Sequence, residues 1–155
     1  MPAQHILKLS DVPHHLDTVV HWNHEQWGRK SGRTLQNSAD WFRQIMRNPS
    51  EDCMVMISGD KVIGMASLVD HDLESRQDLR HWLASVYVVP EQRGNGVAGG
   101  LVAAVEREAA LRGIPLLHLY TENADALYEK LGWSVSEHFM LDEDRFTLMI
   151  KDPAD

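Results

Sequence analysis

A glycine-rich turn is the stretch of this sequence best suited to bind a ligand. Gly94 and Gly96 stand between an apolar run that ends at Val89 and a helical pattern that begins at Val97, and Gly99 lies in the first turn of that pattern. Glycine lets the backbone approach a ligand closely, and the first N–H groups of a helix lack intrahelical acceptors. These N–H groups and the positive end of the helix dipole favour a phosphate or pyrophosphate. The sequence therefore predicts an anion site at this turn.

The same glycines fit two other interpretations. Gly94, Gly96 and Gly99 match the spacing G-x-G-x-x-G, and Glu122 follows the next apolar run, where a dinucleotide-binding fold places its ribose-binding acid. That fold usually opens with this motif and needs further strand–helix units, whereas only 56 residues follow Gly99 in this 155-residue chain. A turn with a purely structural role is the other interpretation. The spacing alone does not decide among the three.

Two motifs resemble the hallmarks of a known enzyme family. The segment Arg93–Ala98 resembles the R-x-x-G-x-G/A signature of the GNAT acetyltransferases and, as in that family, follows an apolar run, Pro90 and Glu91. The segment Ala126–Trp133 reads A-L-Y-E-K-L-G-W and resembles the second hallmark, a helix ending in L-Y-E-K-x-G-F/W. The order of the expected elements also matches the family over the whole chain.

The resemblance implies one N-acetyltransferase domain over residues 1–155, with an α/β fold of mixed α+β character. Its sheet would be mixed and mostly antiparallel, with about seven strands and about four flanking helices, and would splay open between the strands that contain Leu83 and Ile114. Acetyl-CoA, as the cosubstrate, would lie in this splay. In the family the strand before the turn pairs with the pantetheine arm, the turn holds the pyrophosphate, and an asparagine contacts the cofactor. The corresponding residues are Val86, Tyr87 and Val88 for the arm, Arg93, Gly94, Asn95, Gly96, Val97 and Ala98 for the pyrophosphate, and Asn123.

Tyr128 lies inside the second motif. By pattern alone it is a core tyrosine, because it shares an apolar helical face with Ala124, Leu127 and Leu131. The resemblance assigns a tyrosine at this position to protonating the departing thiolate of coenzyme A. We therefore expect Tyr128 to be catalytic.

No residue stands out as the base that removes a proton from the acceptor. Many members of the family carry an acid on the strand before the turn, where this sequence has Ala84 and Ser85. The substitutes are each more often solvated or structural residues; they are Glu122, Asp72, Glu74, Asp78 and His118. We therefore expect a cationic amine that acidic residues attract and that loses its proton through water, so that no single replacement removes activity.

The expected activity is acetyl-CoA-dependent N-acetyl transfer to a primary amine, by direct attack on the thioester. An acyl-enzyme is not expected, because Cys53 lies outside both motifs in a run typical of a buried strand. The rival interpretation is a non-catalytic module that binds and senses acyl-CoA, and a nucleotide-binding oxidoreductase ranks last. The sequence does not identify the acceptor.

The hydrophobic pattern indicates which elements position these residues. Strands are expected at 5–9, 53–57, 62–69, 83–89, 114–120, 133–141 and 146–151. Helices are expected at 16–28, 38–47, 97–112 and 124–131, with Ser38 as the N-cap of the second. Turns are expected at Ser58–Lys61 and Asp142–Arg145, and a charged loop at 71–80.

Composition narrows the classes of partner. The net charge of −8 opposes nucleic-acid binding, and no run is apolar enough for a membrane span. A single cysteine permits no internal disulfide and favours a reducing, cytoplasmic setting. Four histidines of the first helical region lack suitably spaced acids, so no metal is expected; they are His14, His15, His21 and His24. The oligomeric state is not fixed, and a homodimer is among the assemblies that the sequence allows.

Overall fold

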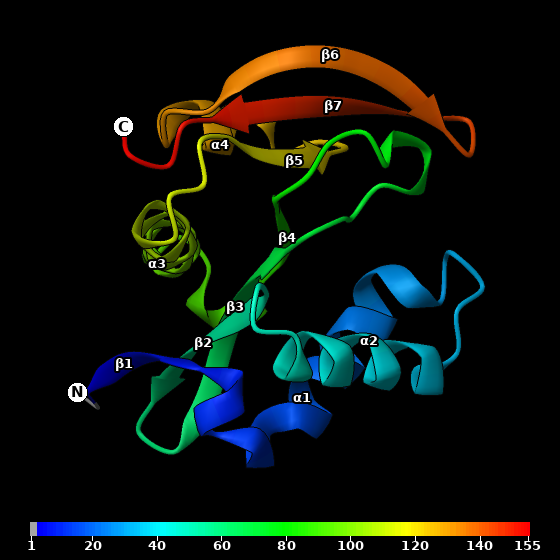
Figure 1. Cartoon of the computed structure of the whole chain (residues 1–155). Helices are drawn as coiled ribbons and strands as arrows, with labels where there is room; N and C mark the ends of the chain where they lie inside the picture. The colour runs from blue at the N-terminus through cyan, green and yellow to red at the C-terminus, as the bar shows by residue number, and fades with distance from the viewer. Residues whose placement is uncertain (1–2) are drawn as a thin grey trace.

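The computed structural model describes residues 3–155, and its centre is a seven-stranded sheet in the order β1-β2-β3-β4-β5-β7-β6 (Figure 1). The strands are β1 (Gln4–Lys8), β2 (Asp52–Ser58), β3 (Lys61–Val69), β4 (Trp82–Val88), β5 (Leu117–Thr121), β6 (Ser134–Leu141) and β7 (Asp144–Lys151). The α-helices are α1 (Leu16–Asn23), α2 (Leu35–Arg47), α3 (Val97–Leu111) and α4 (Asp125–Lys130). Neighbouring strands are antiparallel except β4 and β5, which are parallel. The predicted mixed, mostly antiparallel fold is confirmed.

The sheet separates two hydrophobic cores. Helices α1 and α2 cover one face and α3 covers the other (Figure 1). Successive side chains of a strand point to opposite faces, so Met54 and Met56 of β2 pack toward α3, while Cys53, Val55 and Ile57 pack toward α1 and α2. Helix α4 contributes Tyr128 to the α3 side. Alternate residues of one strand therefore contribute to two separate cores.

Strand β4 is irregular where it passes the centre of the sheet. Ser85 and Val86 together oppose the single Ala66 of β3, and Ser85 has a φ of 54°. A bulge of this kind bends a strand and redirects its side chains. On its other edge β4 meets β5 at only one residue pair, Trp82 with His118, and the two strands then diverge. This divergence, named here the β4–β5 split, is the splay that the resemblance implied.

The start of α2 differs from the prediction. Ser38 is not its N-cap: the cap is Thr34, whose hydroxyl accepts a hydrogen bond from the Asn37 N–H while the Asn37 side chain accepts from the Thr34 N–H. This reciprocal pair satisfies two free donors of the helix end. Ser38 lies one turn inside the helix, where it is buried and donates to the side chain of Asn23.

Two other boundaries move, whereas the end of the first helical segment lies where it was predicted. A π-helical turn, His24–Gly28, continues α1 to the predicted end. Strand β5 begins at Leu117, because Pro115 has no N–H to give to a strand ladder. The last hairpin turns on Asp142 and Glu143 alone, whose φ values of 49° and 70° suit the two-residue turns that match strand twist.

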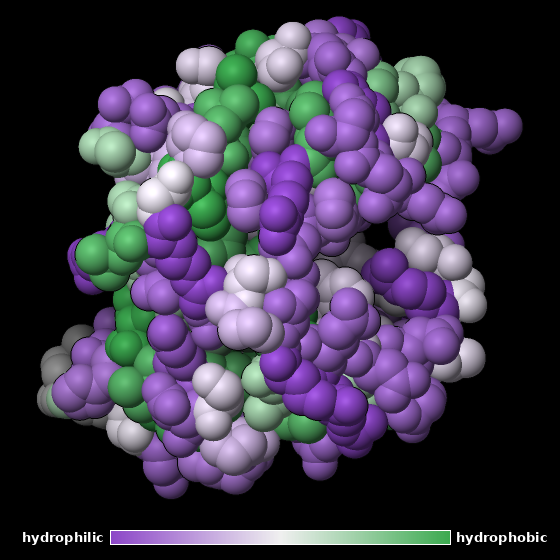
Figure 2. Space-filling view, viewed as in Figure 1, coloured by the Kyte–Doolittle hydropathy of each residue, from purple (hydrophilic) through white to green (hydrophobic). Residues whose placement is uncertain are grey.

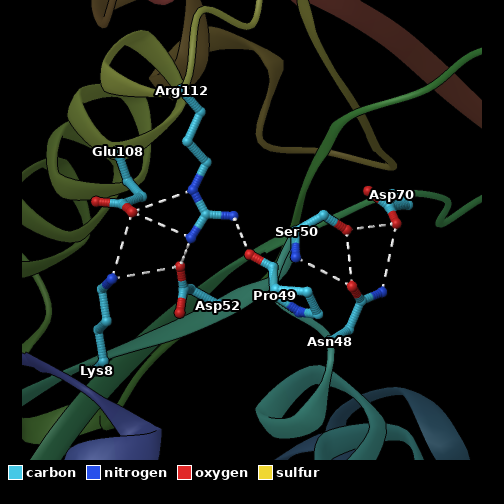
Figure 3. A network of polar contacts seen from close by, with 8 residues as sticks. All are labelled: Lys8, Asn48, Pro49, Ser50, Asp52, Asp70, Glu108 and Arg112. Atoms are coloured by element: carbon cyan, nitrogen blue, oxygen red, sulfur yellow. Dashed lines mark hydrogen bonds and ion pairs between the residues drawn. The ribbon is translucent and has the colours of Figure 1, made fainter.

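A polar network fixes the C-terminal end of α3 to the edge of the sheet (Figure 3). Arg112 pairs with Glu108 and Asp52 and donates to the carbonyl oxygen of Pro49 at 3.1 Å. Lys8 of β1 approaches the same carboxylates, at 3.3 Å from Glu108 and 3.7 Å from Asp52. Burial raises the pKa of Asp52, and the two cations oppose this rise. The helix is thus held firmly at the end far from the glycine turn.

Candidate active site

The glycine turn presents a continuous run of free backbone donors. From Gly94 to Gly99, six successive N–H groups have no hydrogen-bond acceptor among residues 3–155, and the first helical bond is Gly100 N–H to the carbonyl oxygen of Gly96. Gly94 and Gly96 have φ values of 81° and 79°, which glycine adopts without strain, and a Cβ at either would meet open space. Successive free N–H groups before a helix form an anion-binding concavity.

Arg93 fastens the turn to β4. Its Nε donates to the carbonyl oxygen of Val88 at 2.9 Å, and its guanidinium lies 5.5 Å from the ring centroid of Tyr87. A guanidinium carries five N–H donors. Arg93 is exposed, so donors remain for an anion beside the free backbone N–H groups.

The edge of β4 that faces the split is free beyond Trp82. Val89 donates to Ile63 of β3, and successive strand residues direct their N–H and C=O groups to opposite edges. The backbone of Val88 therefore faces the split, consistent with its bond to Arg93. An extended chain could pair with β4 there.

Tyr128 lies on the α3 side of the split, in α4. Its ring is 7% exposed and packs edge-on against Trp133 at 6.2 Å between ring centroids. Burial raises the pKa of Tyr128 to about 12. At this pKa the hydroxyl is protonated at neutral pH, and because it has no hydrogen-bond partner within the described residues it is free to donate to a ligand.

A largely buried ion pair holds the end of α4. Lys151 of β7 donates to Glu106 of α3 and to the carbonyl oxygen of Leu131, both at 2.8 Å. The other carboxylate oxygen of Glu106 accepts from the indole N–H of Trp133 at 3.1 Å. Charge-assisted hydrogen bonds of this kind fix geometry, so Tyr128 is positioned relative to α3 as well as to the sheet.

The two β4 positions at which many members of the family carry an acid contain no carboxylate, and their side chains make contacts inside the protein. Ala84 is buried in the core under α1 and α2. Ser85 accepts a hydrogen bond from Asn23 at 3.4 Å, and Asn23 in turn accepts from Ser38 at 3.0 Å. Asn123 is exposed in the bend before α4. This chain of hydrogen bonds among Asn23, Ser38 and Ser85 was not predicted from the sequence. The one sequence signal for it was Asn23, a polar residue on the otherwise apolar stripe of α1.

The opposite face of the split is lined by aromatic rings. Trp22 of α1 lies 5.1 Å from Tyr87 of β4, and Tyr120 of β5 packs near Trp82 and Phe139. The surface is hollowed at the right of Figure 2, between the β3–β4 connection above and the region of α2 and the α1–α2 connection below.

Ion pairs cross this side of the molecule between the two halves of the sheet. Arg76 of the β3–β4 connection contacts Glu137 of β6 at 2.5 Å. Lys30 of the α1–α2 connection lies 3.3 Å from Asp144 and 4.0 Å from Glu122. All of these groups are substantially exposed, so each pair contributes little to stability. These ion pairs connect the two halves of the sheet on the far side of the split.

Asp72 is the titratable residue of the β3–β4 connection with the most perturbed environment. It keeps partial contact with solvent, yet protein atoms surround its carboxyl group, and burial raises its pKa to about 7. The Arg33 guanidinium opposes this rise, although it does not come within 4.0 Å. Burial raises the pKa of Tyr120, and the charge of Asp72 adds to this rise.

The environment of Asp72 predicts a pH-dependent stability. An acid whose pKa is raised on folding destabilises the folded state when it is ionised. The contribution of Asp72 to the free energy of unfolding is therefore greatest below about 3.9, the pKa of an aspartate in the unfolded chain. This contribution is lost as the pH rises through about 7, the pKa in the folded chain. We expect Asp72→Asn to melt at least about 2–4 °C above the unmodified protein at pH 8, which corresponds to about 1 kcal/mol. The two proteins should melt together at pH 4. Thermal melts of Glu74→Gln, an exposed carboxylate on the same connection, provide the control, and equal melting at pH 8 would show that Asp72 is not destabilising.

The histidines of the first helical region make separate contacts. His14 and His15 lie against each other, His21 Nδ1 is 2.7 Å from the carbonyl oxygen of Asp17, and His24 Nε2 is 3.1 Å from that of Arg33. Residues 3–155 contain no group of three or more His, Cys, Asp or Glu placed to hold a metal ion. In the same part of the chain, none of the helices combines the length and apolarity that a bilayer span requires.

The fold resembles those of two solved acetyltransferases. One is an aminoglycoside 6'-N-acetyltransferase complexed with coenzyme A, with a TM-score of 0.79, 18% identity and coverage of 96% of this chain and 97% of the other. Another is a spermidine/spermine N-acetyltransferase from Vibrio cholerae, with a TM-score of 0.70, 16% identity and coverage of 97% and 93%. At such identities the likeness establishes the fold alone.

Sequence comparison identifies the family. Mycothiol acetyltransferase of Corynebacterium efficiens is 32% identical over 130 residues, which are 81% of this chain and 40% of that protein, so the chain spans about two fifths of this relative's length. The model of the acetyltransferase (GNAT) family matches residues 16–133. That match spans both motifs and both sides of the split, and the chain belongs to the GNAT family of acetyltransferases.

Proposed function

We propose that this protein is an acetyl-CoA-dependent N-acetyltransferase that transfers the acetyl group to a primary amine by direct attack on the thioester. The observation that carries this proposal is the run of six free N–H groups from Gly94 to Gly99, placed beside an open strand edge. A pyrophosphate would satisfy these donors, and no acidic residue occupies the first turn of α3 to repel it. Coenzyme A joins a pyrophosphate to an extended arm, which fits this combination.

The cofactor contacts follow from the same geometry. The pyrophosphate would accept hydrogen bonds from the turn Arg93–Ala98, and the pantetheine arm would pair with Val86–Val88 along the split. Asn123, exposed before α4, would contact the cofactor from the β5 side. The thioester would then lie between β4 and β5, near α4 and Tyr128.

The reaction needs the neutral form of the amine. Its nitrogen lone pair attacks the thioester carbonyl carbon, the C–S bond breaks with its electron pair moving to sulfur, and the nitrogen loses a proton. A thiol has a pKa near 8.5, well below that of Tyr128. Tyr128 therefore stabilises the departing thiolate chiefly by donating a hydrogen bond, and complete proton transfer to sulfur is coupled to release of the proton from the amine.

The charge of the chain and the aromatic rings on one face of the split suit an amine as the second substrate. The chain carries 23 acidic and 15 basic residues, a balance that attracts a cation at long range. The aromatic rings of Trp22, Tyr87 and Tyr120 line the approach and suit a cation with apolar parts.

Release of free thiol from acetyl-CoA tests the proposal. The protein is incubated with acetyl-CoA and, in turn, a polyamine, an aminoglycoside, a lysine peptide and a peptide with a free N-terminus. We expect at least one amine to raise the rate of thiol release well above the hydrolysis that occurs without it. If coenzyme A raises the melting temperature but no amine accelerates release, the protein is an acyl-CoA-binding module and the proposed activity is wrong.

Direct attack makes a further prediction about Cys53. This thiol is buried under α1 and α2, and burial raises its pKa to about 12, so it cannot supply a thiolate to the split. Cys53→Ala should keep its kcat within about twofold of the unmodified value at a temperature where both proteins are folded. Intact-protein mass spectrometry should find no acetylated enzyme during turnover. Loss of activity in Cys53→Ala, with an acetyl group on the unmodified protein, would indicate an acyl-enzyme instead.

A further inference from the structure

Gly64 of β3 is a buried glycine that neither sequence motif contains and that the proposed cofactor contacts do not include. It pairs with Val88 of β4 in the sheet and lies against the start of α3 (Figure 1). Its φ lies outside the left-handed region that favours glycine, so conformational freedom does not explain a glycine here. The space around it does.

A side chain at Gly64 would have no room. A Cβ at this position would lie 2.9 Å from Leu101 Cδ1, 3.0 Å from the carbonyl oxygen of Tyr87 and 3.2 Å from Val97 Cγ1. Non-bonded carbon atoms are normally about 3.5–4.0 Å apart. The absence of a side chain therefore lets both α3 and β4 approach β3 closely.

The three neighbours of Gly64 have little freedom to give way. Leu101 is fully buried, and a close-packed interior has few voids into which its methyl group can turn. Val97 is β-branched, and such a side chain strongly prefers one rotamer in a helix. The oxygen of Tyr87 belongs to the backbone, so it moves only if β4 moves. An added methyl group would therefore displace the backbones of α3 and β4.

These backbones are the ones that the proposed cofactor contacts use. Val97 carries one of the six free N–H groups of the glycine turn, and Tyr87 lies in the β4 segment proposed to pair with the pantetheine arm. Arg93 joins the two parts, because it donates from the turn to the carbonyl oxygen of Val88 at 2.9 Å. Gly64 thus adjoins both parts of the proposed cofactor site.

Helix α3 cannot move away from Gly64 as a whole. At its other end Arg112 pairs with Glu108 and Asp52 and donates to the carbonyl oxygen of Pro49 at 3.1 Å (Figure 3). The 15 residues of the helix span about 22 Å at 1.5 Å per residue. With the far end held, a displacement beside Val97 tilts the helix, and its first turn moves most.

We propose that Gly64 is a positioning residue for the coenzyme A site. Its lack of a side chain sets the spacing between the free N–H groups at the start of α3 and the β4 edge. This role rests on the proposed function, since it presupposes that coenzyme A spans these two parts. Relief of the contacts at Gly64 needs shifts of several tenths of an ångström, and binding sites tolerate only about 0.5 Å.

Gly64→Ala tests this role through the affinity for coenzyme A, measured by isothermal titration calorimetry at a temperature where circular dichroism shows a folded protein. We expect the Kd to rise at least about tenfold. Gly100→Ala is the matched control, because it adds the same methyl group on the side of α3 that faces the sheet. The nearest atom there, Met56 Cε, is 3.4 Å away at the end of a flexible side chain, so the Kd should stay within about twofold.

A second control separates position from stability. Ile63→Val removes one methyl group from the residue beside Gly64, which is 5% exposed in the core under α3. Such a deletion lowers the melting temperature and leaves the backbone in place, so Ile63→Val should bind coenzyme A like the unmodified protein. If Gly64→Ala also melts lower but keeps its Kd within about twofold, Gly64 serves only packing and the proposed role is wrong.

A double variant decides the matter if Gly64→Ala does not fold. Leu101→Ala removes the atom closest to the added methyl group, whereas the carbonyl oxygen of Tyr87 remains 3.0 Å away. Gly64→Ala with Leu101→Ala should therefore fold and bind coenzyme A at least about fivefold more weakly than Leu101→Ala alone. Equal affinities would contradict the role of Gly64. If the unmodified protein does not bind coenzyme A at all, the proposed function fails as well.

Discussion

Gly96→Val is expected to abolish coenzyme A binding while leaving the protein folded. Gly96 caps α3 with a φ of 79°, and a side chain there would project into the space before the free N–H groups. A β-branched residue at this φ is strained and shifts the backbone toward negative φ, which turns those donors away from the ligand. Since pyrophosphate binding depends on several donors at once, we expect affinity to fall at least about 100-fold.

The effect can be measured by thermal melting. Coenzyme A at about a hundred times its Kd should raise the melting temperature of the unmodified protein by about 5–11 °C, which corresponds to about 2.7 kcal/mol. Gly113→Val is the matched control, because Gly113 also has open space and a φ of 74° but lies just beyond the other end of α3. Both variants should lose similar stability, and only Gly96→Val should lose the response. An unchanged response in Gly96→Val would place the cofactor elsewhere.

Tyr128→Phe is expected to lower kcat at least about tenfold, which is about 1.4 kcal/mol of barrier. The substitution keeps the ring that packs on Trp133 and removes a hydroxyl that has no partner within the described chain. The stability of the protein and its affinity for coenzyme A should therefore change little. The effect should concentrate in kcat, because the hydroxyl donates only to the sulfur that gains charge in the transition state.

The pH profile gives an independent check on Tyr128. Because burial raises the pKa of Tyr128 to about 12, its hydroxyl stays protonated through the working range, and the unmodified enzyme should show no loss of kcat between pH 8 and pH 10 from this group. Trp133→Phe is a useful comparison, since it perturbs the packing of Tyr128 and leaves the hydroxyl in place. If Tyr128→Phe keeps full activity, the residue serves only the core.

Local signals account for what the sequence predicted well. The glycine turn and the L-Y-E-K helix are each contained within a few residues, so their composition determines their backbone conformation. The split followed from family resemblance, and the single Trp82–His118 pair confirms it. The boundary errors came from competing local rules: Thr34 and Ser38 are both acceptable N-caps, and only the partner of Ser38 across α1 decides between them.

The special environment of Asp72 could not be predicted, because it depends on chain segments far apart in the sequence. In the sequence Asp72 is one of several acids in a charged loop, indistinguishable from Glu74 and Asp78. Burial in the folded chain raises its pKa, and Arg33, 39 residues before it in the sequence, opposes this rise. Residue type identifies candidates, whereas burial and partners distinguish among them.

Acyl transfer itself is tested most directly with acetyl-CoA labelled with ¹³C at the acetyl carbonyl carbon, supplied with the amine that supports thiol release. Carbon NMR then follows the label. We expect the thioester signal to be replaced by an amide signal on the amine, in equal amount to the free thiol, and only when active protein is present. Free thiol without amide, or amide that forms equally fast without the protein, would contradict N-acetyl transfer at the β4–β5 split.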